Sequence, residues 1–287
     1  MATIKEYQVK IANLRNTRKI TGSMKMISSI KMQQMTKTAE SFSPFAEESA
    51  RIASCMAGLA SREGSLWFDG WKETKRVRLL LVTGDRGLCG RFNMNTVKTC
   101  LQRIGEETAG NRSVVVSCIG NKGHAYLKRF GMPVDVNYEG IIGRPQWSAI
   151  DGVADDVLKE FSSGRTQQIW VVYTKRRGGF YEEPVIEPIL PLPGALKEAA
   201  NVDYLLEETP DGLCDVAARL FVRSVIFGAV IGSALAEQTA RMTAMESASS
   251  NCDRMISKYM QLRNRARQSA ITTELNEIVT GKEALES

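Results

Sequence analysis

The sequence predicts an α/β fold: a central Rossmann-like domain with a parallel sheet, joined to long N- and C-terminal helices that form an antiparallel coiled coil. Three observations lead to this prediction. Residues 211–280 contain no proline, and the chain before Pro44 contains none either. Between these two ends, apolar runs typical of buried strands alternate with segments of helical periodicity. The predicted domains are residues 1–60, 61–210 and 211–287.

The N-terminal helix is predicted from its apolar periodicity. Before Pro44 the segment contains a single glycine, Gly22. Its apolar residues recur at near-heptad spacing, as in a helix that pairs with another helix. They are Ile4, Ile11, Leu14, Met24, Ile27 and Met35. Polar Thr17, Thr21 and Ser28 interrupt this stripe, which is too thin for a self-sufficient coiled coil, so we expect contacts on more than one side of the helix.

The central domain is predicted to alternate strands and helices. Residues 76–83 and 113–119 are apolar runs rich in leucine and valine, as expected for strands buried on both faces. A further strand is predicted at residues 168–174. The helices are predicted at residues 93–109, 122–130 and 147–161. Strands and helices in this order and spacing imply a parallel sheet with crossover helices.

Two further segments, residues 185–190 and 204–207, are candidates for edge strands. Prolines are found at sheet edges and in loops because they cannot donate a ladder hydrogen bond. Four of them make the region loop-like: Pro184, Pro188, Pro191 and Pro193.

The C-terminal helix is predicted over residues 211–280, where the only glycines are Gly212, Gly228 and Gly232. Gly281 follows, and glycine is favoured just after a helix end. Seventy helical residues span roughly 105 Å, about twice the width of a compact domain of this length. We therefore expect neither terminal helix to bury itself in the rest of the protein. The partner of the C-terminal helix is then the N-terminal helix, another protein, or both.

The middle of this helix is rich in small residues. Fourteen of the 23 residues at 228–250 are Gly, Ala, Ser or Thr. Such side chains permit the close approach of another backbone, so we expect this stretch to pack against the N-terminal helix in an antiparallel pair. A free helical tail of high propensity is the alternative.

Composition excludes several classes of protein. A hydrophobic content of 43% is enough for a sizeable core. The sequence contains no run of 18 apolar residues, so no membrane span is predicted. The N-terminus lacks the apolar stretch of a signal peptide. Six scattered cysteines without a CxxC pair argue against a disulfide framework or a zinc site, and no metal site is predicted. The single histidine, His124, leaves few acid–base constellations available.

Positive charge is concentrated at the two helical ends. Residues 1–40 carry eight Lys or Arg and two Glu, for a net charge of +6, the excess of the whole chain. Residues 251–270 carry five basic residues and one Asp, for a net charge of +4. A basic helix suggests an acidic protein surface, nucleic acid or anionic lipid as partner, while a solvated face is the alternative.

One glycine-rich turn follows the first predicted strand. It consists of Asp85, Arg86, Gly87, Leu88, Cys89 and Gly90. Such turns can bind phosphate through backbone N–H groups, but this one matches neither GxxxxGK[ST] nor GxGxxG. A nucleophilic Cys89 would need His124 as its base, and no spacing signature links the two. We favour a tight turn with a packed cysteine.

A cluster of long donors lies near the C-terminus. Arg265, Arg267 and Gln268 occupy about one helical turn. Arginine binds carboxylates bidentately, so the cluster suits acidic groups on a partner, and an exposed, solvated turn is the alternative.

Taken together, these segments make the chain resemble the gamma subunits of bacterial-type rotary ATP synthases over essentially its full length. The first matching block comprises Lys19, Ile20, Thr21, Met24, Lys25, Met26, Ile27, Lys31 and Met32. The second comprises the glycine-rich turn and Asn93. The third comprises Glu237, Gln238, Thr239, Ala240, Arg241, Met242, Ala244 and Met245, then Arg267, Gln268, Ile271, Thr272, Glu274, Leu275, Glu277, Ile278, Val279 and Gly281.

The resemblance implies a rotor. In that family the terminal helices form a coiled coil inside a hexamer of alternating alpha and beta subunits, one copy per complex. The α/β domain and the epsilon subunit grip the membrane c ring, whose ion-driven rotation drives the beta subunits through their catalytic states. It also implies that the chain has no catalytic residue or cofactor of its own, because ATP, ADP and Mg²⁺ bind the alpha and beta subunits. The location implied is the cytoplasmic face of the bacterial inner membrane, as a peripheral protein.

The same resemblance implies roles for particular residues. Contacts with the acidic catch loops of the beta subunits fall on Arg265, Arg267, Gln268 and Thr272, with Arg241 as a further candidate. Met24 and Lys25 would lie beside the lower lobe of a beta subunit. The foot that meets the c ring falls on Tyr204, Leu205, Leu206 and Glu207, although family members often carry a second aromatic residue near Leu206. The inserted cysteine pair of plastid members is missing, so thiol regulation is not predicted.

Two other functions compete with this interpretation. A basic helical protein that binds nucleic acid or acts as a scaffold would show steeply salt-dependent DNA binding. An α/β enzyme with a helical dimerisation arm would have a pocket with perturbed titratable groups near Asp85 and Cys89. Neither alternative accounts for the three matching blocks.

Overall fold

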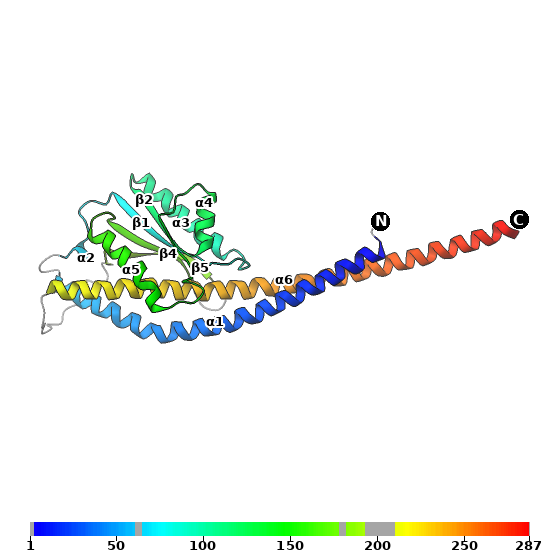
Figure 1. Cartoon of the computed structure of the whole chain (residues 1–287), viewed down its shortest axis with the longest axis horizontal. Coiled ribbons are helices and arrows are strands. Elements are labelled where there is room, and N and C mark those ends of the chain that lie inside the picture. The colour runs from blue at the N-terminus through cyan, green and yellow to red at the C-terminus, as the bar shows by residue number, and fades with distance from the viewer. Residues whose placement is uncertain (1–2, 61–64, 178–181, 193–209, 287) are drawn as a thin grey trace. The chain divides into compact units, whose positions relative to one another are not determined.

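The computed structural model describes residues 3–60, 65–177, 182–192 and 210–286. The chain divides into two compact units, each described by itself. The sheet unit consists of residues 29–241, and the coil unit joins the residues up to 28 with those from 242 onward. The helices are α1 (Ile4–Ala60), α2 (Leu66–Asp69), α3 (Phe92–Ala109), α4 (Asn121–Arg129), α5 (Trp147–Ser162) and α6 (Pro210–Glu286) (Figure 1). The strands are β1 (Arg76–Val82), β2 (Ser113–Ile119), β3 (Val136–Tyr138), β4 (Gln168–Arg176) and β5 (Glu182–Leu190).

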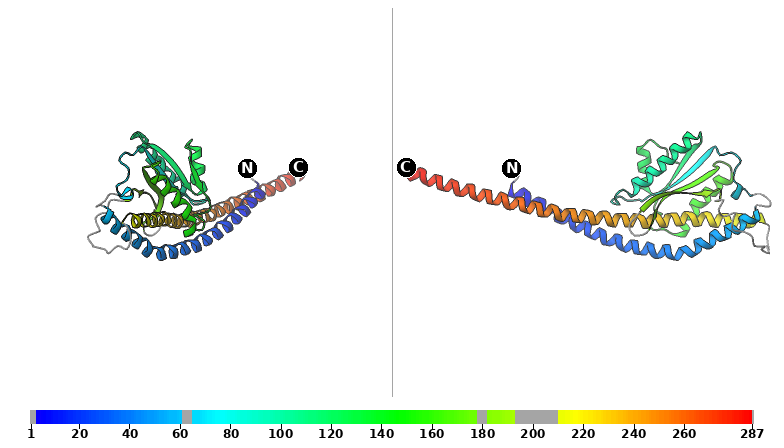
Figure 2. Two further views of the ribbon diagram at one scale, coloured as in Figure 1. Left: turned by 60° about the vertical axis from the view of Figure 1, so that its left-hand side comes forward. Right: turned by 180° about the vertical axis from the view of Figure 1, so that it is seen from behind.

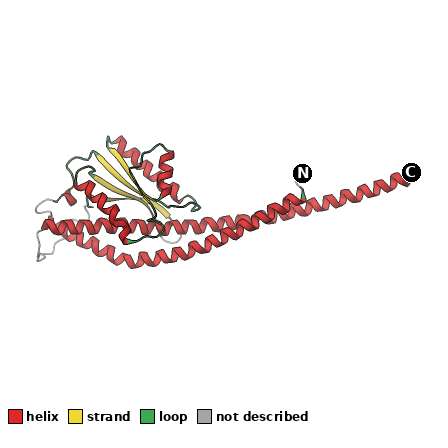
Figure 3. Ribbon diagram, viewed as in Figure 1, coloured by secondary structure: helices red, strands yellow, loops and turns green. Residues whose placement is uncertain are grey.

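The sheet unit has the predicted Rossmann-like sheet. Its strand order is β3-β2-β1-β4-β5, with β1 parallel to both neighbours and β5 antiparallel to β4. Figure 3 draws the strands in yellow among the red helices. The three strands and three helices predicted for its interior are confirmed within a few residues. The three-residue strand β3 was not predicted because it is too short to show a periodic pattern. The edge strand expected at residues 204–207 lies outside the described residues.

Both faces of the sheet are covered, which explains the unbroken apolar runs of the inner strands. Leu79 and Leu81 of β1 pack with α3 and α4, while Leu80 and Val82 pack with α5 and α6. This alternation is the two-residue period of a strand, and here each side of it meets a layer of helices.

Helix α6 contributes directly to the core of the sheet unit, so the expectation that neither terminal helix buries itself in the rest of the protein is wrong. Its residues Phe221, Ile226 and Val230 belong to the main core cluster. The small-residue stretch packs against the sheet as well as against α1. A Cβ added to Gly232 would lie 3.5 Å from the Tyr173 ring, and one added to Gly228 would lie 3.6 Å from Phe42.

The same helix contains an 18-residue window that is long and apolar enough for a membrane span, with a mean hydropathy of 1.7. Of that window, 72% is buried inside the protein. Its apolar character is therefore accounted for by the core. At the other end of α6, the expected stop at Gly281 is wrong. Gly281 lacks the positive φ of a helix-terminating glycine, and the helix continues to Glu286.

The coil unit is an antiparallel helix pair (Figure 2). Two ion pairs show its direction, since Arg18 bonds Asp253 at 2.9 Å and Lys25 bonds Glu246 at 2.7 Å. At its end the Tyr7 and Tyr259 rings lie 6.1 Å apart between centroids.

The seam of this coil differs from the predicted stripe. Thr21 and Ser28, expected as interruptions, are buried in the seam, whereas Ile27 is 55% exposed. The seam passes through Ile11, Thr21 and Ser28, whose intervals fit one heptad pattern. Ile27 lies one position before Ser28 and therefore faces outward. A seam with threonine and serine explains why the apolar stripe looked too thin.

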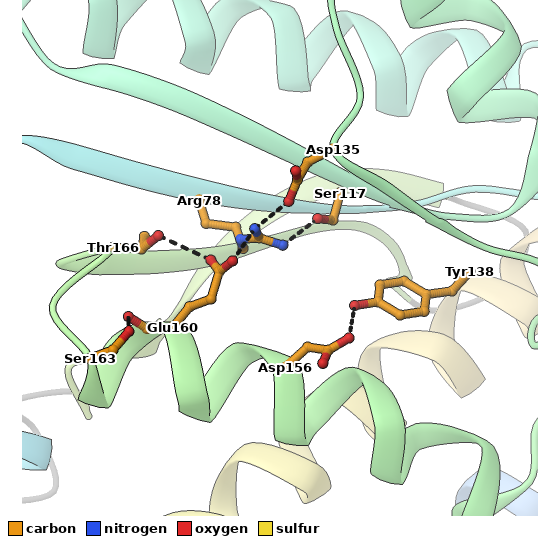
Figure 4. Close-up of polar contacts among 8 residues, drawn as sticks. All are labelled: Arg78, Ser117, Asp135, Tyr138, Asp156, Glu160, Ser163 and Thr166. Carbon is orange, nitrogen blue, oxygen red and sulfur yellow. Dashed lines mark hydrogen bonds and ion pairs between the residues drawn. The ribbon is translucent and has the colours of Figure 1, made fainter.

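A buried arginine ties three elements of the sheet unit together (Figure 4). Arg78 of β1 is 3% exposed and donates to Ser117 of β2 at 2.5 Å. It also donates to Asp135 at 2.6 Å and to Glu160 of α5 at 2.8 Å. Beside this cluster the Tyr138 hydroxyl donates to Asp156 at 2.8 Å. Burial of the Tyr138 hydroxyl raises its pKa most, and the Asp156 carboxylate raises it further. The cluster fastens α5 to the sheet.

Glu182 predicts a pH dependence of stability. Burial raises the pKa of this carboxyl from 4.5 to about 7. Between these two pH values the folded protein holds a proton that the unfolded chain releases, so stability falls as the pH rises through this window. Glu182→Gln should therefore be the more stable protein at pH 8, by about 1 kcal/mol because the group is only half-buried, and indistinguishable from wild type at pH 4. Urea denaturation at both pH values measures this difference, and an equal difference at the two would contradict it.

Candidate partner-binding surfaces

The carboxyl edge of the sheet is the place where doubly wound folds bind ligands. Here the chain's own groups occupy it. The Thr83 hydroxyl accepts from the Gly123 N–H at 2.8 Å, and the Asp85 carboxylate accepts from the Asn121 N–H at 3.1 Å. Both N–H groups belong to the first turn of α4, where a phosphate would otherwise bind.

The glycine-rich turn is held from inside by Asn93 of α3, which is 4% exposed. Its side-chain oxygen accepts from the Gly84 N–H at 2.8 Å. Its amide group donates to the Arg86 carbonyl at 3.3 Å and to the Cys89 sulfur at 3.1 Å. The turn is therefore closed onto the start of α3 and has a defined conformation.

Two residues of α6 close the turn from the other side. The Arg241 guanidinium donates to the Gly87 carbonyl at 3.2 Å and to the Glu237 carboxylate. Both side chains are at least 90% buried. Burial raises the pKa of Glu237, and the neighbouring Arg241 opposes that rise. With the carboxylates of Asp85 and Glu237 at this edge, the crevice is unsuited to a phosphate group.

The cysteine of the turn is packed rather than reactive. Cys89 is 2% exposed, and its thiol contacts Asn93 and the Arg86 carbonyl. Burial raises its pKa, so the thiol stays protonated at neutral pH. Among the described residues, no group of three or more His, Cys, Asp or Glu could hold a metal ion.

The turn presents one apolar side chain outward. Leu88 has a φ of 65°, in the left-handed region that bulky residues rarely adopt, and it is 63% exposed. Arg86 beside it is exposed as well. The network beneath the turn holds this conformation in place.

In the coil unit, the predicted donor cluster is on the surface. Arg265, Arg267, Gln268 and Thr272 are all exposed. The Thr272 hydroxyl donates to the carbonyl of Gln268 at 3.0 Å. Since α1 starts at Ile4 and Tyr7 already faces Tyr259, this part of α6 extends beyond the start of α1.

An exposed apolar stripe lies next to this cluster and was not singled out in the sequence. It consists of Ile271, Leu275, Ile278 and Val279, which are 49% to 63% exposed. Their spacing of four, three and one residues is that of one helix face, so the pattern was visible. What the sequence lacked was evidence that the described residues of the coil unit leave this face exposed.

The other predicted site residues have different surroundings. Met24 is half-buried, and Lys25 is paired with Glu246 within the coil. Arg241 is engaged inside the sheet unit, so its contact with a partner stays a prediction that needs the Glu237 pair to open. The predicted foot, Tyr204, Leu205, Leu206 and Glu207, lies outside the described residues.

Comparisons with known proteins agree over nearly the whole chain. The family model described as ATP synthase matches residues 3–285. The ATP synthase gamma chain of Aromatoleum aromaticum is 34% identical, with 99% of this chain and 100% of that protein covered. The ATP synthase gamma chain of Haemophilus influenzae is 32% identical, with the same coverage.

Solved structures share the fold. A chain of the Euglena gracilis mitochondrial ATP synthase (OSCP, F1 and c ring) matches with a TM-score of 0.67 and 18% identity, over 98% of this chain and 94% of that one. A chain of the Tetrahymena thermophila mitochondrial ATP synthase central stalk and c ring matches with a TM-score of 0.62 and 22% identity, over 80% of this chain and 99% of that one.

Proposed function

Because this chain belongs to the ATP synthase gamma chain family, we propose that it is the central-stalk rotor of an ion-translocating ATP synthase. It couples rotation of a membrane c ring to the conformational cycle of catalytic sites on beta subunits. The observation that carries the proposal is the part of α6 around residues 265–279, which presents exposed donors and an exposed apolar stripe.

The chemistry of this surface fits the interior of a hexamer of alpha and beta subunits. Residues 251–270 carry a net charge of +4, which suits acidic loops. Arg265, Arg267, Gln268 and Thr272 would bind these loops, and the apolar stripe would lie against less polar surface. A few charged contacts keep any one orientation from becoming a deep energy well, which a rotor must avoid.

Catalysis belongs to the partners in this proposal. The ligand crevice of the sheet unit is filled by Thr83, Asp85 and Glu237, and the Cys89 thiol is buried and protonated. The chain then needs no cofactor or metal, and ATP, ADP and Mg²⁺ bind the alpha and beta subunits.

The remaining partners are the epsilon subunit and the c ring, with one copy of this chain per complex. The similarity to chains of solved assemblies with F1, a c ring or a central stalk supports this part of the proposal. In this proposal the protein lies on the cytoplasmic face of the bacterial inner membrane, held there through the complex.

Reconstitution tests the function. The full chain is mixed with the alpha–beta hexamer and compared with a variant that ends before Asn264. We expect one full-length chain to bind each hexamer, and the steady ATPase rate to be higher than that of the hexamer alone. The shortened chain should give a lower rate, because it lacks the exposed donors and the apolar stripe. Failure of the full chain to bind the hexamer would contradict the proposal.

A further inference from the structure

The glycine-rich turn is fastened to one face of α6. Ala236 packs with Cys89 and Phe92 in a small separate core, and Ala240 packs against the same core. Glu237 and Arg241 each follow one of these alanines and are four residues apart, so they are neighbours along the edge of this face. One turn further back, the Ser233 hydroxyl accepts from the Thr174 N–H of β4 at 3.3 Å.

The apolar and polar parts of this face have different mechanical properties. Alanine and glycine give a smooth contact, and dispersion between small side chains has no preferred direction. Such a contact resists separation of α6 from the sheet but offers little resistance to rolling of the helix about its own axis. Hydrogen bonds lose strength steeply with angle, and charge-assisted ones are the strongest.

Glu237 and Arg241 supply these directional contacts where the turn meets α6. The guanidinium bonds the Gly87 carbonyl at 3.2 Å, and the carboxylate fills the space above Gly84, where an added Cβ would lie 2.9 Å from the carboxyl carbon. The glycine-rich turn is itself hydrogen-bonded to α3 through Asn93 and to α4 through Asp85. A continuous chain of hydrogen bonds therefore connects α6 with both helices on the other face of the sheet.

We propose that the Glu237–Arg241 pair and the glycine-rich turn form a torsional joint, which stops α6 from rolling against the sheet and so transmits torque between them. Glu237 and Arg241 are positioning residues for rotation. This inference rests on the proposed rotor function.

Torsional stiffness tests the joint in the assembled complex. The hexamer is fixed to a surface and stalled with a non-hydrolysable nucleotide, and a bead is attached to the sheet unit. The thermal angular variance of the bead then reports how easily the rotor twists. In Arg241→Gln and in the isosteric Glu237→Gln, this variance should rise by about twofold or more, because the ion pair is lost and any hydrogen bond that remains is weaker. Arg241→Lys keeps a charge and a donor and should stay closer to wild type.

The matched control is Arg219→Gln on the same helix. Arg219 is 55% exposed and lies 3.6 Å from Asp155, so its ion pair contributes little rigidity. Unchanged variance in Arg241→Gln and Glu237→Gln, or an equal rise in Arg219→Gln, would overturn the joint. If Arg241→Gln does not assemble, Glu237→Gln decides alone. A wild-type chain that does not rotate in the hexamer refutes the proposed function itself, whereas a rotating wild type with equally stiff variants refutes only the joint.

Discussion

Replacing Arg265, Arg267 and Gln268 together by alanine is expected to reduce ATP-driven ion transport by about tenfold, because three charge-assisted or polar contacts to acidic partner loops are lost. Assembly should change less, since the apolar stripe from Ile271 to Val279 remains. Transport by reconstituted vesicles and the stoichiometry of the purified complex measure these two effects separately.

The matched control changes two basic residues and one glutamine about two to three helical turns earlier. Arg254, Lys258 and Gln261 are also exposed, and their triple alanine variant loses the same charge. We expect this control to retain most of the transport. Equal losses in both triple variants would show that net charge matters rather than the position of the donors. Wild-type transport in the first variant would refute the assignment of the contact.

Arg78→Met is expected to lower the free energy of unfolding by about 3 kcal/mol or more, because it leaves two carboxylates near one another without their buried cation. Asp135 and Glu160 are 45% and 23% exposed, so water compensates part of the loss. Urea denaturation of the isolated chain measures this difference.

Two further variants identify the cause. Adding Glu160→Gln to Arg78→Met removes one of the unpaired charges and should recover part of the stability. Lys75→Met removes an exposed ion pair with Glu73 and should change stability by less than about 1 kcal/mol. A loss below that value in Arg78→Met would show that the arginine contributes no more than a surface residue.

Much of the architecture was predictable from local pattern. Unbroken apolar runs located the three inner strands, and segments of helical periodicity located the helices between them. The long stretches without proline located α1 and α6. Arg265, Arg267 and Gln268 are exposed, which is compatible both with the predicted partner contact and with the solvated turn that the sequence left as the alternative.

The seam of the coil was decided by tertiary packing. Periodicity shows which residues are apolar, but the register of two paired helices selects the face that is covered. A difference of one position placed Ser28 inside at 2% exposure and Ile27 outside at 55%. Likewise, the small residues in α6 were expected to pack against the N-terminal helix, and the structure shows that β4 shares that contact with α1.

In the sheet unit, tertiary packing also decided which charged residues are buried and paired. Arg241 and the C-terminal arginines look alike in sequence, yet Arg241 bonds Glu237 and the Gly87 carbonyl, 154 residues away along the chain. Arg78 similarly finds carboxylates from two distant segments. By itself, the sequence of this protein determined its periodic elements and the approximate extent of its helices, because these depend on neighbours along the chain. Only the tertiary structure decided the seam, the buried ion pairs and the closed turn, because each depends on groups that meet after folding.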